Sequence, residues 1–372
     1  MDLNLTSDQQ LFRAATRKFL EREATTVRIR ELTEAKIGFE RSYWQTASEL
    51  GWTSLLVPEE MDGGSISGQP LADLAIVAEE AGQFAAPGPL AVTNAVIAGL
   101  LNVEGAKAHA GVIGEIASGA AVATWAVYEP GKGWDPFEPT ATATRFEGGF
   151  RLNCVKDRVE VGDQADLFLV GARLDGELCQ FLVRADAPGV RVDKMWSLDF
   201  TRHFATVTFD NVAVPRKALV EDARTAIEYQ CQTLFALQCA ETCGATARVF
   251  DMALEWAFDR YAFGRSLASY QAIKHRFADM KTWLEAMHAI TVGAIRSVQD
   301  RADTASKISR VASIYVARKS VEIMQDCVQI HGGIGVTWEY DLHIFLRRAT
   351  VNRALYGTPE EQRSALSALL AY

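Results

Sequence analysis

The sequence predicts an α+β protein with three successive parts: an N-terminal helical domain (1–120), a middle antiparallel, β-barrel-like domain (121–225) and a C-terminal helical bundle (226–372). Three observations carry this prediction. Apolar residues recur at helical spacing up to about residue 120, alternate in short runs as far as Pro215, and then return to helical spacing. The chain has 372 residues and is 49% hydrophobic, which is enough for a large buried core.

A capping signal opens the N-terminal part. Thr6 stands three residues before Gln9, ahead of apolar residues at helical spacing, so a helix is expected to start there. Further helices are expected over 71–84 and 90–103, after the turn-rich stretch 58–64. The first part of the chain is therefore helical.

Short runs rich in β-forming residues predict the strands of the middle part. They are expected at 122–128, 140–146, 167–170, 181–183, 190–192 and 204–209. Helical periodicity resumes after Pro215 and includes an apolar seam from Ile273 to Met287. That seam is longer than a short-helix bundle needs to cover itself, so the C-terminal part is expected to build an oligomer interface.

Charge and cysteine usage exclude several classes of protein. The net charge of −9 argues against a nucleic-acid or anionic-membrane surface, although a local patch such as Arg347-Arg348 remains available for phosphates. We find no apolar run near 18 residues and no leader pattern, so a cytoplasmic location is expected. The six cysteines lack a C-x-x-C pair and histidine partners, which predicts buried thiols and no metal site.

A basic, glycine-broken loop between two long helical patterns is the candidate binding site. Arg260 offers a planar fork of donors, Phe263 a ring face, Gly264 a permissive backbone and Gln271 an amide that donates and accepts. This set suits a nucleotide with a pyrophosphate. The plain alternative is a solvated turn between two helices.

Together with the segment Gln329-Ile-His-Gly-Gly-Ile-Gly335, this loop resembles the acyl-CoA dehydrogenase family of flavoproteins, and the resemblance covers the whole chain. It implies FAD as cofactor, an acyl-CoA substrate, and α,β-desaturation of the thioester, with the helical N-terminal domain forming a wall of the acyl pocket. It also implies that the ADP half of an FAD is held here while the flavin ring lies in a neighbouring subunit. The positions carried over are Arg260, Phe263, Gln271, Gln329, Gly332 and Gly333.

The chain departs from the family where the flavin ring is expected. The family's Thr-Glu-Pro-Gly strand end reads Tyr128-Glu-Pro-Gly here, so the threonine is missing. Arg158 and Glu160 stand where the family has an aromatic and a hydroxyl residue, which removes a stacking platform and a donor. This resemblance therefore places the chain's own flavin pocket in question. Alternatively, Arg158 and Glu160 are a pair on one solvated strand face.

Desaturation needs a carboxylate to remove the α-proton, and both of the family's positions for it are changed. They hold Tyr356, whose ordinary pKa near 10 makes a poor base, and Leu234. The nearest candidate is Glu241, two helical turns from Leu234 and so about 10.5 Å away. Burial would raise its pKa toward the range of a base unless a cation is nearby, so a base and a structural carboxylate both remain open.

Two other titratable residues invite the same question. His331 precedes the glycine pair of the second motif, and Lys274 follows the loop. We read His331 as a loop residue near phosphates and Lys274 as a solvated helix residue. Glu360 and Glu361 follow Thr358 and Pro359 as a helix start, so they have a local structural explanation.

Three functions fit these observations. The chain is a self-sufficient acyl-CoA dehydrogenase that uses Glu241, or a half-site subunit that completes a partner's FAD site in a heteromer, or an enzyme of non-oxidative CoA-thioester chemistry on the same fold. The intact loop beside the altered ring pocket and empty base positions favours the second. The expected partner is a related acyl-CoA dehydrogenase subunit, with a homo-oligomer as the alternative.

Overall fold

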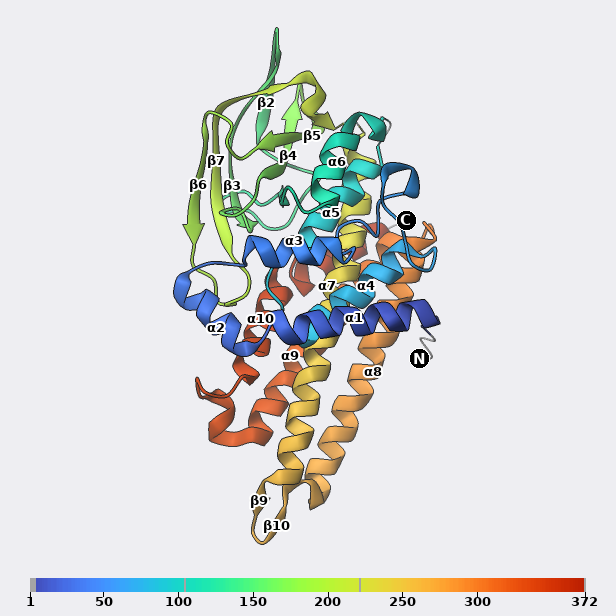
Figure 1. The fold of residues 1–372 in the computed structure, drawn as a ribbon, viewed down its shortest axis with the longest axis vertical. Helices are drawn as coiled ribbons and strands as arrows, with labels where there is room; N and C mark the ends of the chain where they lie inside the picture. The colour runs from blue at the N-terminus through green and yellow to red at the C-terminus, as the bar shows by residue number, and fades with distance from the viewer. Residues whose placement is uncertain (1–4, 104, 221, 371–372) are drawn as a thin grey trace.

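The computed structural model describes residues 5–103, 105–220 and 222–370. Figure 1 shows the strands gathered at one end of an elongated molecule, the N-terminal helices across its middle, and long C-terminal helices running to the other end. The predicted α+β organisation is confirmed, with helices, then a sheet, then helices along the chain.

The first helices begin where the sequence signals place them. The Thr6 hydroxyl accepts from the Gln9 amide at 3.2 Å, and the Gln9 side chain accepts from the Thr6 amide at 3.1 Å, so the capping box is confirmed. The helices of this part are α1 (Ser7–Glu23), α2 (Thr26–Ala35), α3 (Arg41–Glu49), α4 (Pro70–Gln83), α5 (Leu90–Leu101) and α6 (Ala110–Ala117).

One mixed sheet forms the middle of the chain. Its strands are β1 (Ala123–Ala126), β2 (Thr142–Phe146), β3 (Gly149–Glu160), β4 (Leu167–Leu174), β5 (Glu177–Arg184), β6 (Val190–Met195), β7 (Phe204–Pro215) and β8 (Leu219–Val220). They follow the order β6-β7-β3-β2-β4-β5-β8, with β1 beside β4. The expected antiparallel pairing is incomplete, because β4 pairs in parallel with both β1 and β2.

The sequence runs did not predict β3, although it is one of the two longest strands. Its pairing with β7 shifts register twice, between Leu152 and Cys154 and between Lys156 and Val159. The first shift adds a residue to β7, and the second adds one to β3, where it breaks the alternation of inward and outward side chains. A search for period-two alternation therefore passes over this strand.

Long helices make up the C-terminal part. They are α7 (Ala223–Asp259), α8 (Gln271–Gln299), α9 (Ala305–His331), α10 (Leu342–Ala354) and α11 (Pro359–Leu370). A two-stranded hairpin, β9 (Tyr261–Ala262) and β10 (Arg265–Ser266), joins α7 to α8 at the far tip of the molecule (Figure 1). Among the described residues, no helix is both long and apolar enough to cross a membrane.

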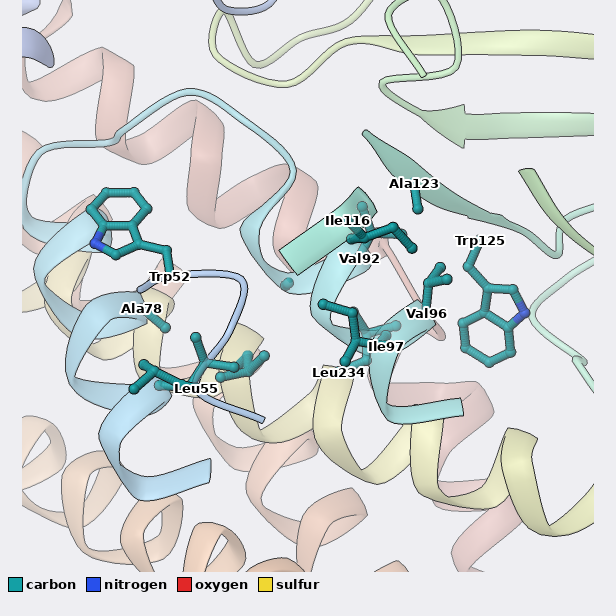
Figure 2. Packing of buried hydrophobic residues seen from close by; sticks show 14 of the residues in the cluster. Trp52, Leu55, Ala78, Val92, Val96, Ile97, Ile116, Ala123, Trp125 and Leu234 are labelled. Carbon is teal, nitrogen blue, oxygen red and sulfur yellow. The ribbon is translucent and has the colours of Figure 1, made fainter. Parts of the chain in front are cut away.

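Helix α7 is the common core element, because α4 and α5 of the N-terminal part pack on it. Figure 2 shows Leu234 of α7 beside Ile97 and near Val92 and Val96 of α5, all in one buried apolar cluster. Farther along, α4 and α7 approach until their backbones touch. A Cβ added at Gly82 would lie 1.9 Å from the Glu241 carbonyl oxygen, so only glycine fits there.

We expect Gly82→Ala to lower stability by about 1 to 3 kcal/mol, because the added methyl group forces α4 away from α7. Thermal unfolding followed by circular dichroism measures the shift. Gly111→Ala is the matched control: Gly111 is an exposed residue of α6, and its added Cβ meets nothing within 4 Å. That change is expected to leave stability equal or slightly higher. Equal midpoints for Gly82→Ala and the wild type would contradict the contact between α4 and α7.

Candidate cofactor and active site

The first motif lies on the hairpin at the tip. Arg260 is the residue at which α7 ends, and the two-residue turn between β9 and β10 is made by Phe263 and Gly264. Both turn residues have positive φ, 52° and 81°, as a type I′ turn requires. Phenylalanine is strained in this conformation, yet its side chain is 99% exposed. A strained aromatic held in solvent points to a contact outside this chain.

The structure brings the second motif beside the first through one tryptophan. The His331 ring stacks on Trp256 of α7, with centroids 5.4 Å apart and planes 22° from parallel. The Arg260 guanidinium lies 6.0 Å from the centroid of the same indole. Gln329 and the glycine pair that follows His331 therefore belong to the same end of the bundle as Arg260.

His331 is a buried, neutral support in this arrangement. Its Nδ1 donates to the Cys327 carbonyl at 2.7 Å, because a carbonyl only accepts, and its Nε2 lies 2.9 Å from the Tyr340 hydroxyl. Burial lowers the pKa of His331 below its usual value near 6.5. Both ring nitrogens are occupied, which leaves His331 a role in holding the loop and none in proton transfer. Lys274 is exposed on α8, as expected.

The exposed groups of the two motifs suit a phosphate-bearing cofactor. The side chains of Arg260, Gln271 and Gln329 are exposed and make no hydrogen bond or ion pair with other described residues. A Cβ added at Gly332 or Gly333 would meet nothing within 4 Å, so the backbone there is open to a ligand. A guanidinium and two amides beside an open backbone can hold a pyrophosphate and an adenosine, as FAD requires.

In the region where the resemblance expects the flavin ring, Arg158 and Glu160 do not form a solvated pair. The second β3 bulge follows Lys156, so Arg158 and Glu160 do not share a solvated face, and that interpretation is wrong. Arg158 has φ 46°, lies 4.2 Å from the Tyr128 ring centroid and donates to the Lys132 carbonyl at 2.7 Å. The Glu160 side chain is only 3% exposed.

An ion pair joins the two segments of this region that were compared with the family, at Glu129 and Lys156. Glu129, from the Tyr-Glu-Pro-Gly segment, accepts from the buried Lys156 ammonium at 2.9 Å and from the Thr140 amide at 2.9 Å. Burial would raise the pKa of Glu129, but hydrogen bonds from Thr140 and the charge of Lys156 outweigh it and lower the pKa to about 2. Both charged groups of this ion pair are thus paired within the chain.

Aromatic side chains occupy the space beside these strands. The Trp134 ring contacts Trp125, Tyr128 and Tyr356, with centroids 5.6, 5.2 and 5.4 Å apart. The backbone amide of Tyr356 donates to the Tyr128 hydroxyl at 2.6 Å. These contacts join the sheet to the loop that carries one of the family's base positions.

Neither of the family's base positions offers a base. Leu234 is fully buried in the apolar cluster of Figure 2. Tyr356 is buried and its hydroxyl donates to the Glu160 carboxylate. Burial and the neighbouring Glu160 raise the pKa of Tyr356 well above 10, so it stays protonated near neutral pH.

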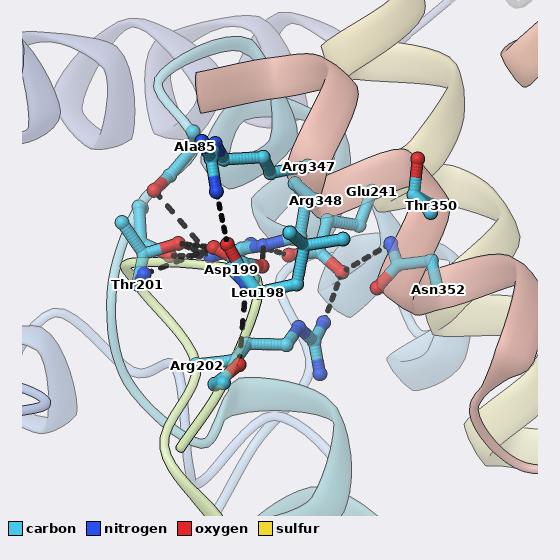
Figure 3. Close-up of polar contacts among 12 residues, drawn as sticks. Ala85, Leu198, Asp199, Thr201, Arg202, Glu241, Arg347, Arg348, Thr350 and Asn352 are labelled. Carbon is cyan, nitrogen blue, oxygen red and sulfur yellow. Dashed lines mark hydrogen bonds and ion pairs between the residues drawn. The ribbon is translucent and has the colours of Figure 1, made fainter. Parts of the chain in front are cut away.

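Glu241 is held between two arginines, as Figure 3 shows. Its carboxylate accepts from Arg202 and Arg348, and from Asn352 Nδ2 at 3.3 Å. Burial alone would raise the pKa of Glu241, but the two guanidinium charges lower it below its ordinary value. The pKa of Glu241 was expected to rise unless a cation lay nearby, and two such cations, Arg202 and Arg348, contact its carboxylate.

The ionic cluster continues from Glu241 into all three parts of the chain. Arg202 also donates to Glu160 at 2.6 Å, and Arg348 to Asp199 at 2.5 Å and to the Ala86 carbonyl at 3.1 Å. It therefore links the α4–α5 loop, the sheet, α7 and α10. The expected phosphate patch at Arg347-Arg348 is wrong for Arg348, which is 1% exposed.

The sequence contained a signal for this cluster that periodicity could have found. On α10 the buried residues Phe345, Arg348 and Asn352 follow one another at spacings of three and four. A charged residue on the apolar face of a helix indicates a buried partner. Arg202 and Asp199 lie in an irregular loop before β7, where no period marks them.

Little space remains next to Glu241. The cavity there measures about 10 Å³, which is room for about one water molecule. Its walls come from α4, the start of α5 and the loop before it, α7, Trp52 and Arg202. They are Trp52, Ala78, Ala81, Ala86, Pro87, Gly88, Leu90, Ala91, Arg202, Leu237 and Glu241. An acyl chain does not fit beside this carboxylate in the present conformation.

The cysteines are free thiols, four of them buried and Cys154 and Cys179 half-buried. Burial raises the pKa of Cys154 to about 11 and that of Cys231 to about 12, so neither is a thiolate near neutral pH. Among the residues that the structure describes, no group of three or more metal-binding side chains comes together.

Comparison with known proteins gives concordant matches. The IpdE2 acyl-CoA dehydrogenase of Mycolicibacterium smegmatis is 29% identical over 98% of this chain and 99% of its own length. The solved Tcur3481-Tcur3483 steroid ACAD is 25% identical, with a TM-score of 0.87 and 97% of each chain covered. The ChsE4-ChsE5 complex of Mycobacterium tuberculosis is 23% identical, with a TM-score of 0.89 over 100% of this chain and 99% of that one.

Family models agree with these relatives. The model of the acyl-CoA dehydrogenase N-terminal domain matches residues 6–119, and that of the acyl-CoA dehydrogenase C-terminal domain matches residues 236–370. Since the two models together match well over half of the chain, and the relatives match nearly all of it, this protein belongs to the acyl-CoA dehydrogenase family.

Proposed function

We propose that this chain is the subunit of a heteromeric acyl-CoA dehydrogenase that completes the FAD site of a partner subunit. One observation carries the proposal: the exposed hairpin motif is free to bind a cofactor, while the chain's own base and flavin-ring region is closed by buried ion pairs and aromatic rings. The residues proposed for the ADP half of FAD are therefore accessible, whereas the region for the flavin ring and the base is filled by the chain's own side chains.

The groups offered to the shared FAD are those of the two motifs at the tip. Bound FAD supplies the hydride acceptor for desaturation. The Arg260 guanidinium can bind phosphate oxygens in bidentate fashion, and the amides of Gln271 and Gln329 can bind the adenosine half. The proposed cofactor residues are Arg260, Phe263, Gln271, Gln329, Gly332 and Gly333.

Proton abstraction is assigned to the partner. A base must reach the α-carbon and take up a proton, but Glu241 is fixed by Arg202 and Arg348 in its ionised form. An acyl group has no room beside it, since the cavity there measures about 10 Å³. Tyr356 is protonated and donates to Glu160. A related subunit with the family's glutamate in place would supply the missing base.

The substrate class follows from the family and its relatives. Members act on acyl-CoA thioesters, and one relative is a steroid ACAD. The solved ChsE4-ChsE5 structure is that of a complex, which supports a heteromer as an architecture for this fold. We therefore propose an acyl-CoA with a fatty or steroid side chain as the substrate of the assembled enzyme.

Purified alone, the chain is expected to bind FAD weakly and to reduce little dye with acyl-CoA substrates. Co-expression with a partner that carries the glutamate should restore yellow colour and turnover, with fewer than one FAD per chain. Flavin absorbance, light scattering and dye reduction on both preparations test this. Turnover by the isolated chain equal to that of the pair would instead indicate a self-sufficient enzyme. CoA-thioester conversion by the isolated chain without dye reduction would indicate non-oxidative chemistry.

Arg260→Ala in the co-expressed pair should lose most of the bound FAD and keep the fold, because Arg260 is exposed and its charge-assisted bonds go to the cofactor. Flavin absorbance after gel filtration and far-UV circular dichroism measure the two effects. Arg216→Ala, at another exposed arginine in the turn between β7 and β8, is the matched control and should retain FAD. Full flavin retention by Arg260→Ala would contradict the proposed role of the hairpin.

Glu241→Gln separates a structural carboxylate from a catalytic base. It leaves Arg202 and Arg348 short of a buried anion, so stability should fall by about 3 to 5 kcal/mol while turnover per folded pair is unchanged. Glu255→Gln, an exposed change on the same helix, is the matched control and should alter neither. A base would give the opposite result: a loss of roughly two to four orders of magnitude in rate with stability retained.

The same carboxylate predicts a pH dependence of stability. The folded-state pKa of Glu241 lies below its ordinary value of 4.5, so its contribution is fully present above about pH 4.5. It is lost as the pH falls through the folded-state pKa. In acid, the difference in unfolding midpoint between wild type and Glu241→Gln should therefore shrink. A difference that stays constant from pH 7 to about pH 2 would show that the charge of Glu241 is not what stabilises the cluster.

A further inference from the structure

A second hollow lies away from the cofactor motifs and from Glu241. It measures about 310 Å³ and opens between α1, α4, α7 and α8. Its walls are fixed in place: the Gln9 amide of α1 donates to the buried Asp73 carboxylate at 2.7 Å, and α4 touches α7 at Gly82. The hollow is therefore preformed, and its volume is at the lower end of the range for small-molecule sites.

The floor of this cleft is apolar. Its side chains come from three helices and are buried or half-buried. They are Ala72, Ala75 and Ile76 of α4, Ala240 of α7, and Val292 and Ile295 of α8. The polar atoms that also border it, the Cys243 thiol and the Thr291 hydroxyl, lie 3.5 Å apart and bond to each other. The floor thus offers a surface for an aliphatic chain.

The mouth carries one surplus positive charge. Two arginines neutralise the carboxylates of Glu79 and Glu80. Arg13 Nε lies 2.5 Å from one carboxylate oxygen of Glu80, and Arg17 Nε lies 2.8 Å from the other. Arg296 has no such partner among the described residues, and it borders the apolar floor.

His288 also lines the mouth and faces the existing acids. Its Nδ1 lies 3.7 Å from the Glu79 carboxylate, so it adds positive charge only when protonated. Among the described residues that line the mouth, the Arg296 guanidinium is therefore the cation without an acidic partner.

From these contacts we infer that the cleft binds a monocarboxylate with a short or medium-length aliphatic chain. The carboxylate would pair with the planar fork of Arg296, and the chain would lie on the apolar floor. A single free guanidinium matches a single negative charge, and six small or branched apolar side chains match a hydrocarbon. The site is separate from the FAD motifs, so it does not depend on the proposed function.

Isothermal titration of the full-length chain with octanoate tests this site. Saturable binding of about one octanoate per chain is expected. Octanol and inorganic phosphate should bind much more weakly, because octanol lacks the carboxylate and phosphate lacks the aliphatic chain. Arg296→Gln should weaken octanoate binding roughly tenfold to a hundredfold, since one charge-assisted bond pair is lost. Ala72→Leu, which fills the cleft from its half-buried edge, should weaken it as well.

Arg216→Gln is the control for loss of an exposed arginine and should bind octanoate as the wild type does. Circular dichroism of each variant confirms that the fold is kept. The proposal is overturned by any of three results: no saturable octanoate binding, octanol or phosphate binding as tightly as octanoate, or equal binding by Arg296→Gln and the wild type. Binding of many octanoate molecules per chain, as in nonspecific adsorption, would overturn it too.

Discussion

The buried ion pairs of Arg202 and Arg348 with Glu241 are the constraint on which the rest of this structure depends. Arg202 comes from the loop before β7 in the middle part, and Glu241 and Arg348 come from α7 and α10 of the C-terminal part. Arg348 also donates to the Ala86 carbonyl, which ties the N-terminal part to the same cluster. Taking such charges out of water costs several kcal/mol per ion, which good geometry and further hydrogen bonds must offset. The cluster therefore holds only if each part keeps its position.

That requirement explains why the region around Glu241 in the core is closed, in contrast to the hairpin at the tip. Around Glu241, every charged group has a partner inside the chain and the free space is about one water molecule. At the tip, a guanidinium and two amides make no hydrogen bond or ion pair with other described residues, and an aromatic ring is exposed. A protein that catalysed its own reaction would need the reverse around its carboxylate: an unpaired group facing a substrate-sized cavity.

The sequence predicted the order of helices and strands because that order rests on local periodicity and local caps. The capping box at Thr6 is an example, and so are the long helices that flank Arg260. Periodicity cannot show β3, in which the bulge after Lys156 breaks the alternation, nor the parallel pairs of β4, which depend on how distant strands meet.

The same distinction between local patterns and distant contacts applies to the candidate site. The resemblance picked out the residues of the hairpin and of the second motif, and the structure places those two motifs together around Trp256. The spacing on α10 marks Arg348 as buried, but the sequence does not show that Arg348 and Arg202 meet at Glu241, because both lie more than 35 residues away along the chain. The direction of a pKa shift depends on such distant partners: the rise expected from burial held only without a nearby cation, and the two arginines lower the pKa of Glu241 instead.

Helix α7 carries Glu241 near its middle and Arg260 at its end, so its length and twist set where the hairpin lies relative to the buried ion pairs. The nineteen helical steps from one to the other span roughly 28 Å at 1.5 Å per residue. Each residue also turns the helix by about 100 degrees. A single inserted residue would therefore displace the hairpin only slightly but swing it to another side of the molecule. In this lineage, length changes in that stretch should survive only when they keep the angle of the hairpin, as additions of close to whole turns do.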